Sequence, residues 1–301
     1  SQGKARTMRK WFSAVRLSAA VAVGFLLASL PSAGQTPAAR SLRMPDGKPN
    51  LNGLWQALNS AYWDIEDHAA RQGPVIALGA AFSVPEGHGI VEGGSIPYRP
   101  EALAKKRENA EKWMTLDPEI KCYLPGVPRA TYMPYPFEIV QTGTDVLIAY
   151  EFANASRTIY MNSKDEAQID FWMGWSRGRW EGDTLVVDVT GLNDQTWFDR
   201  AGNFHSDALH VIERYAPIDA DHLRYEATIE DPKVFTRPWK MSMPLYRRVE
   251  SNAQLGEYIC VEFAEELLYG SLTKKPTKSH EEPGRPSCSR PAGAPARPKE
   301  E

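Results

Sequence analysis

The chain has 301 residues with 35 basic and 38 acidic side chains, so its formal net charge is −3. Hydrophobic residues make up 42% and charged residues 24%. This is the composition of a folded globular protein, and it excludes a collagen, a coiled coil or a wholly disordered chain. Because nucleic-acid-binding domains carry a basic excess, the near-neutral balance argues against nucleic acid as a partner.

The sequence of residues 1–34 is predicted to contain a short upstream remnant followed by a secretory signal peptide. Arg6, Arg9 and Lys10 precede an apolar run at 17–30, and small residues follow it. This order is typical of a signal peptide, whereas a membrane-spanning helix needs about 20 apolar residues. We therefore expect a periplasmic or extracellular protein whose mature form has no membrane span. A retained anchor is the alternative.

The sequence contains three cysteines, Cys122, Cys260 and Cys288. An oxidising compartment permits one disulfide. Cys288 lies in the Pro-rich stretch 271–301, which has too few apolar residues to fold and is predicted to be a disordered tail. Cys122 and Cys260 lie in patterned sequence and are the expected pair. The alternative is two unpaired buried thiols.

Residues 35–270 are expected to form one domain with a helical and loop insertion at about 59–134. The run 101–114 predicts a helix because it is rich in strong helix formers and follows a proline. A strand is expected at 52–55, and nine more short strands follow the insertion. Short strands at near-regular spacing are typical of an antiparallel β-barrel or a sandwich. We predict a mostly antiparallel, lipocalin-like barrel of about eight to ten strands. The later strands are expected at 136–142, 145–152, 156–162, 170–176, 184–191, 207–215, 222–231, 237–246 and 257–264.

Alternation of apolar and polar residues predicts which side chains face the barrel interior, because hairpin partners share a face of the sheet. Pairing Tyr215 with His222 sets His210 opposite Ala227 and places Tyr225 on the same apolar face. A histidine in an apolar interior is either a hydrogen-bonded core residue or a catalyst.

The next hairpin pairs Ile229 with Trp239, so Trp239 is expected inside. The same register sets Asp231 opposite Arg237. Because a buried charge is costly unless it is paired, these two are expected to form an ion pair at the rim or part of a site. A third hairpin places Arg157 near the end of the interior face.

Polar side chains are densest in residues 190–214, which are expected to form a loop at one barrel mouth, where function often concentrates. One interpretation is acid–base catalysis by His205 or His210, oriented by Asp199 or Asp207. A second is a metal site. It is disfavoured because residues 205 and 207 share a strand face that residue 210 does not. A third is a structural role in which these side chains cap turns.

A small molecule is the expected ligand, with no metal and no cofactor. The residues predicted to hold it combine cations, a carboxylate and aromatic rings: Arg157, Arg237, Asp231, Trp239, Tyr225 and Trp197. The leading prediction is an exported barrel that binds a partly apolar or carbohydrate-like molecule. If it is an enzyme, it is a cofactor-free hydrolase, lyase or isomerase. The alternative is a non-catalytic envelope or ligand-binding protein whose polar loop is purely structural. No oligomeric state is predicted.

Several motifs between about residues 45 and 270 resemble a widespread family of uncharacterised secreted bacterial proteins, found especially in acidobacteria and proteobacteria. The motifs are at 117–129, 136–141, 178–188, 205–215, 230–232 and 237–239. This resemblance implies an exported protein and supplies no reaction. Gly53 and Trp55 also resemble the first strand of lipocalin-type barrels, in which an arginine packs over the tryptophan. Arg247 or Arg248 is the candidate for that role.

Overall fold

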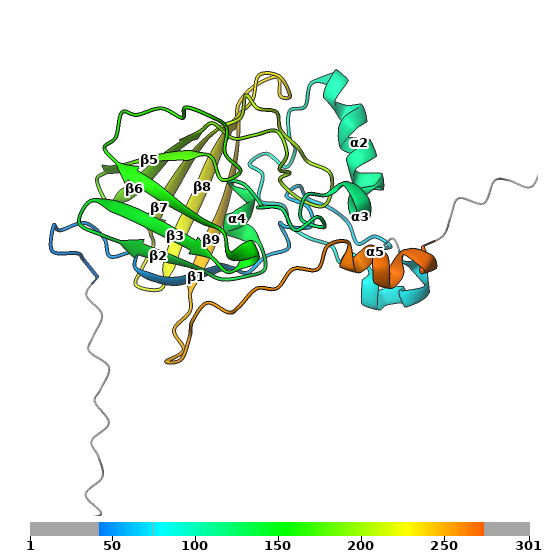
Figure 1. Cartoon of the computed structure of the whole chain (residues 1–301), viewed down its shortest axis with the longest axis horizontal. Coiled ribbons are helices and arrows are strands. Elements are labelled where there is room, and N and C mark those ends of the chain that lie inside the picture. The colour runs from blue at the N-terminus through cyan, green and yellow to red at the C-terminus, as the bar shows by residue number, and fades with distance from the viewer. Residues whose placement is uncertain (1–41, 74, 274–301) are drawn as a thin grey trace, which may run out of the picture. The chain divides into compact units, whose positions relative to one another are not determined.

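The computed structural model of the chain describes residues 42–73 and 75–273. The predicted signal peptide and the predicted tail beyond residue 273 lie outside the described residues. Nine strands close into a barrel in chain order, with β1 paired to β9 (Figure 1). Neighbouring strands are antiparallel except β4 and β5, which are parallel. The predicted β-barrel is therefore confirmed. Its strands are β1 (Gly53–Ala57), β2 (Phe137–Gln141), β3 (Asp145–Tyr150), β4 (Ser156–Met161), β5 (Trp175–Glu181), β6 (Thr184–Thr190), β7 (His210–Pro217), β8 (His222–Glu230) and β9 (Trp239–Arg247).

Most predicted strands form where they were expected, with two exceptions. The run 170–176 is mainly a loop, and β5 begins only at Trp175. The run 257–264 forms no strand and leads into helix α5 (Ala264–Tyr269). A closed barrel has no free edge with which another strand can pair. Because β1 already pairs with β9, the run 257–264 has no edge of this sheet to join.

The predicted helix at 101–114 forms as three consecutive pieces beside the barrel (Figure 1). These are η2 (Pro100–Ala102), α2 (Leu103–Glu111) and α3 (Trp113–Leu116). Within the described residues, no helix has the length and apolarity that crossing a bilayer requires. The remaining short helices are η1 (Ile76–Phe82), α4 (Arg129–Tyr132), η3 (Phe152–Asn154) and η4 (Gly270–Leu272).

The first strand carries the lipocalin-like feature that the sequence suggests. Trp55 is fully buried, and its Nε1 donates to the carbonyl of Leu51 at 2.8 Å. The guanidinium carbon of Arg247, rather than that of Arg248, lies 3.9 Å from the centre of the Trp55 ring. Gly53 has a φ of +126°, and a Cβ there would lie 2.5 Å from the Arg247 guanidinium. Glycine at this position therefore makes room for the arginine.

The β8–β9 register agrees with the prediction. Ile229 lies opposite Trp239, and Tyr225 lies opposite Met243. These side chains are buried inside the barrel, with exposed fractions of 3% or less. Alternation along both strands therefore predicts their interior faces correctly.

The β7–β8 register differs from the prediction. Tyr215 pairs with Tyr225 instead of His222. Because side chains alternate between the two faces of a strand, this odd shift turns β7 over. Glu213 and Tyr215 face the interior and are fully buried, whereas His210 lies on the outer face. The prediction that His210 lines the interior is wrong.

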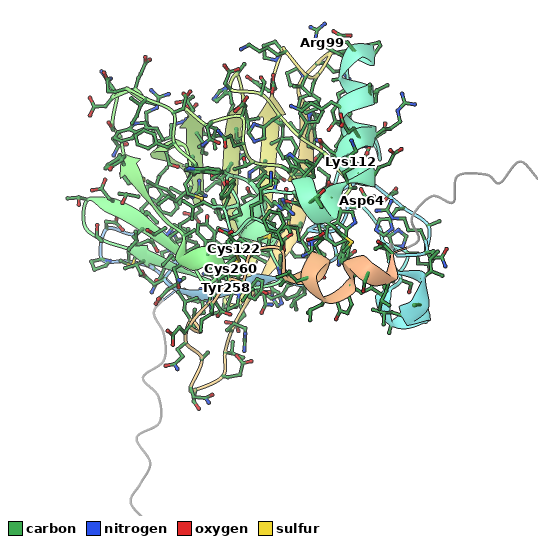
Figure 2. The ribbon with its side chains drawn as sticks, turned by 45° about the vertical axis from the view of Figure 1, so that its right-hand side comes forward. Asp64, Arg99, Lys112, Cys122, Tyr258 and Cys260 are labelled. Atoms are coloured by element: carbon green, nitrogen blue, oxygen red, sulfur yellow. A yellow bond between two sulfur atoms is a disulfide. The ribbon has the colours of Figure 1, made fainter. Side chains whose placement is uncertain are left out.

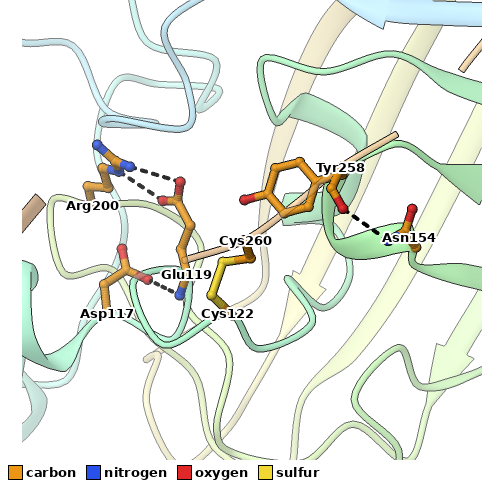
Figure 3. The surroundings of a disulfide bond; sticks show 7 residues. All are labelled: Asp117, Glu119, Cys122, Asn154, Arg200, Tyr258 and Cys260. Carbon is orange, nitrogen blue, oxygen red and sulfur yellow. Dashed lines mark hydrogen bonds and ion pairs between the residues drawn. A yellow bond between two sulfur atoms is a disulfide. The ribbon is translucent and has the colours of Figure 1, made fainter. Parts of the chain in front are cut away.

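The predicted disulfide between Cys122 and Cys260 is confirmed, with 5.8 Å between the two Cα atoms. It ties the chain after β9 to the segment that precedes α4 (Figure 2). Nearby, Asn154 donates to the carbonyl of Tyr258 (Figure 3). We call residues 256–273 the strap. The disulfide and these contacts hold the strap against the rest of the domain.

Candidate functional site

The polar loop at 190–214 does not present its histidine for catalysis. His205 is buried, and its Nε2 lies 2.6 Å from the Thr196 hydroxyl. Its Nδ1 lies 2.9 Å from the carbonyl of Ser206. Burial lowers the pKa of His205, so the ring is held neutral. With both ring nitrogens engaged, His205 fixes the loop instead of serving as a general base.

Asp199 is equally enclosed. Its carboxylate accepts from the backbone N–H of Ile65 at 2.9 Å and from the backbone and side chain of Asn203. Burial, together with the charge of Asp64, raises the pKa of Asp199 to about 7. A carboxyl with such a pKa is a candidate acid. Asp199 is fully buried, however, and its three donors are structural.

The other acidic residues of this region have similar roles. Asp231 is buried and accepts from the backbone of Ser206 at 2.6 Å and from that of Lys233 at 3.0 Å. Asp207 is exposed and forms an ion pair with Lys233. Arg237 is also exposed and donates to the carbonyl of Pro238, so the predicted Asp231–Arg237 pair is wrong.

His210, the leading predicted base, lies on the outer surface of the barrel. Its Nε2 is 3.2 Å from a carboxylate oxygen of Asp188, and its Nδ1 is 3.1 Å from one of Glu230. Asp188 also forms an ion pair with Arg177. These contacts run across neighbouring strands on the outer face, and one of them, Arg177–Asp188, is an ion pair of two permanently charged groups. Among the described residues, no group of three or more histidine, cysteine, aspartate or glutamate side chains is arranged to hold a metal ion.

Arg157 is inside the barrel, as predicted, where it pairs with Glu213. The two bonds of this pair measure 2.6 and 2.9 Å, and the five N–H groups of the guanidinium are all donated. Glu213 is the partner that sequence reasoning missed. The predicted pairing of Tyr215 with His222 turns Glu213 to the outer face, whereas the observed pairing turns it inwards. The remaining partners of the pair are hydroxyl groups, those of Ser176, Tyr150, Tyr215 and Tyr225.

The predicted aromatic ligands are core residues. Trp239 is buried between Phe198 and Phe235, with both rings edge-on to it. Tyr225 donates to Glu213 at 2.8 Å from inside the barrel. Trp197 is also buried, on a bridge to Phe204 outside the barrel strands. The predicted site residues therefore lie in three separate places and do not converge.

A pocket of about 380 Å³ lies at one end of the barrel, and we call it the mouth pocket. Gln141 of β2, Val146 of β3, Met161 of β4 and Trp180 of β5 line it. By alternation along their strands, all four face the barrel interior. Ligand sites often occupy the mouths of β-barrels.

The rim of the mouth pocket is polar. The β2–β3 turn brings the hydroxyls of Thr142 and Thr144, and Asn162 follows β4. The Asn162 backbone has a φ of +57° and donates to the carbonyl of Gly178. Its side chain has no hydrogen-bond partner within the part of the chain that the structure describes. The pocket thus combines a largely apolar wall with a polar edge.

A hairpin at residues 43–49 forms the outer wall of the mouth pocket. Arg43 and Pro49 are bridged, and Arg43 donates two bonds to Asp183, of 2.9 and 2.8 Å. The Lys48 ammonium lies 5.8 Å from the centre of the Trp180 ring. Both members of the Arg43–Asp183 pair are more than half exposed. Exposed ion pairs contribute little to stability, so the Arg43–Asp183 pair adds little to the attachment of the hairpin.

Sequence reasoning missed the mouth pocket because its walls carry no charged motif. One signal was present in Gly178, which stands in the middle of β5. A Cβ at Gly178 would lie 2.5 Å from the sulfur of Met161. A glycine inside a strand often marks such a close approach.

A scan against protein-family models finds no match to this sequence, and a search of curated proteins finds none either.

Proposed function

We propose that this protein is an exported, non-catalytic binding protein that holds a small, partly apolar molecule in its mouth pocket. The observation that supports this proposal is the composition of the pocket. Interior-facing Met161, Trp180 and Val146 lie beneath a polar rim. Its volume of about 380 Å³ suits one small molecule.

The chemistry of the ligand follows from the two parts of the pocket. A ring or short aliphatic group would pack on Trp180 and Met161. Hydroxyl or carbonyl groups at its other end would bond Thr144 and Asn162. A negative charge on the ligand is disfavoured because Asp46 and Asp145 line the pocket.

Binding is favoured over catalysis because the candidate acid–base groups are already engaged. His205, Asp199 and Asp231 are buried and bonded within the loop. A general base must reach the proton that it abstracts. None of these three residues is among those that line the mouth pocket.

The mouth pocket is tested with the neutral fluorescent probe N-phenyl-1-naphthylamine and with native mass spectrometry of the protein purified from its source. We expect the probe to bind and a co-purifying molecule to compete with it. Gly143→Trp should weaken probe binding at least about tenfold, because Gly143 lines the pocket and a Cβ there meets no atom within 4 Å. Val249→Trp, at an exposed site, is the matched control. Equal binding by both variants, or no binding at all, would overturn the proposal.

Export is supported by the predicted leader and by the Cys122–Cys260 disulfide, since stable disulfides belong to oxidising compartments. Cell fractionation combined with N-terminal sequencing of the mature protein tests it. We expect an N-terminus near residue 35 in the periplasmic or secreted fraction. A full-length chain in the cytosol would contradict it.

A further inference from the structure

A second groove, of about 310 Å³, lies outside the barrel and shares no lining residue with the mouth pocket. We call it the tryptophan groove, because Trp63 and Trp113 form its wall. Asp64 and Lys112, their neighbours in the chain, mark its place in Figure 2.

The aromatic wall is fixed in place. The Trp63 and Trp113 rings are 5.4 Å apart and nearly perpendicular. The guanidinium carbon of Arg200 lies 4.6 Å from one ring centre and 4.8 Å from the other. Arg200 itself donates two hydrogen bonds of 2.8 Å to Glu119 (Figure 3). It also forms an ion pair of 3.1 Å with Glu265. Its charge is therefore neutralised, and it braces the rings.

Polar side chains that are available to a ligand also line the groove. Gln72 and Glu111 are exposed, and neither side chain has a hydrogen-bond partner within residues 42–73 and 75–273. Arg71 uses one guanidinium nitrogen on Asp64, at 3.3 Å. The backbone bridge between Arg71 and Val84 holds this side of the groove in position.

We propose that the tryptophan groove binds a neutral saccharide. A pyranose ring has an apolar face of C–H groups, which packs on a tryptophan such as Trp63. Its edge carries hydroxyls, which pair with an amide, a carboxylate and a guanidinium. Gln72, Glu111 and Arg71 provide these three groups. Both cations that line the groove are already paired, Arg71 with Asp64 and Arg200 with Glu119. The groove therefore offers an acidic sugar no uncompensated positive charge, which favours a neutral ligand.

The test uses the full chain and isothermal titration with cellobiose, maltose and N,N′-diacetylchitobiose, with digalacturonic acid as the anionic comparator. We expect at least one neutral disaccharide to bind with a Kd in the millimolar range or below, and to change tryptophan fluorescence. Gln72→Ala and Glu111→Ala should each weaken binding about tenfold. Both side chains are exposed, so the variants should fold normally. Glu108→Ala, on the same helix, is the matched control.

Three results would overturn the proposal. The first is that no neutral disaccharide binds. The second is that digalacturonic acid binds better than all of them. The third is that Gln72→Ala and Glu111→Ala bind as tightly as Glu108→Ala. Gly143→Trp, which blocks the mouth pocket, should leave disaccharide binding unchanged, so the two proposed sites are tested separately.

Discussion

The buried pair of Arg157 and Glu213 is the main polar feature of the barrel interior. Both charges are removed from water, and each is compensated by the other and by surrounding hydroxyls. Such a pair adds little net stability compared with apolar residues of the same size, whereas losing one partner leaves a buried charge unpaired. We therefore assign the pair to the core of the fold and not to catalysis.

Arg157→Met should lower the free energy of unfolding by about 3–5 kcal/mol, because Glu213 is then buried without its partner. Urea denaturation measures the loss. The matched control is Arg177→Met, which breaks an ion pair with Asp188 on the outer face. Its cost should be below about 1 kcal/mol. Equal losses in the two variants would show that the buried pair contributes no more to stability than the exposed pair.

The raised pKa of Asp199 predicts a dependence of stability on pH. Its pKa is about 7 in the folded chain, compared with an ordinary value of 3.8, so the folded state binds the proton more tightly. Protonation of Asp199 therefore stabilises the folded state. This stabilisation is fully present below about pH 4 and is lost as the pH rises towards 7, which lowers the free energy of unfolding by a figure on the order of 3 kcal/mol.

Asp199→Asn should remove this component, which denaturation at several pH values between 4 and 7 detects. Asp207→Asn is the control. Asp207 is exposed, and its hydrogen bond to Lys233 lowers its pKa. The idea fails if the Asp199→Asn variant keeps the slope of the unmodified protein.

At the scale of elements, the two registers show what a sequence pattern can and cannot predict. Apart from Arg247 at the end of β9, the interior positions of β8 and β9 are apolar or aromatic, so alternation alone identifies them. In β7 the interior carries Glu213, while Ile212 lies outside. The charge of Glu213 is compensated by Arg157, which lies 56 residues earlier. A pairing over that separation cannot be predicted from the pattern within one hairpin.

Gly53 of β1 makes room for the Arg247 guanidinium, which packs over Trp55. Gly53→Ala should lower the free energy of unfolding by about 1–3 kcal/mol, because the new Cβ clashes with Arg247 and the φ of +126° is strained for alanine. Thermal unfolding measures the change. Gly143→Ala, in a turn with open space around it, is the control and should have little effect. A stable Gly53→Ala variant would mean that Arg247 can leave Trp55 at no cost.

At the scale of the whole molecule, the disulfide links segments 138 residues apart in sequence. The strap has many exposed residues, so the disulfide supplies much of its attachment. Cys122→Ser should lower the free energy of unfolding by about 2–4 kcal/mol. Denaturation with and without a reducing agent measures it, and Cys288→Ser is the control. Equal stability of the two variants would show that the strap is held without the bond.

The fold class and the disulfide could be predicted because each rests on a repeated or countable feature, either short strands at regular spacing or cysteines in patterned sequence. The mouth pocket could not. Its walls come from four strands and from the hairpin at 43–49, and only the closed barrel brings them together. The predicted site failed for a related reason. His205 is bonded within its own loop, to Thr196 and Ser206, and Asp199 is enclosed in part by Ile65, which lies 134 residues away. The sequence pattern does not show that folding buries both side chains.

The pairing of β1 with β9, which closes the barrel, affects the order in which the chain folds. Trp55 pairs with Arg247, so nearly the whole domain must exist before the cylinder can close. Contacts over such a separation form slowly. Until then the edge of β1 that will pair with β9 is open, and exposed strand edges invite association with other chains. During synthesis, the interval before Arg247 emerges is when the growing chain most needs a chaperone.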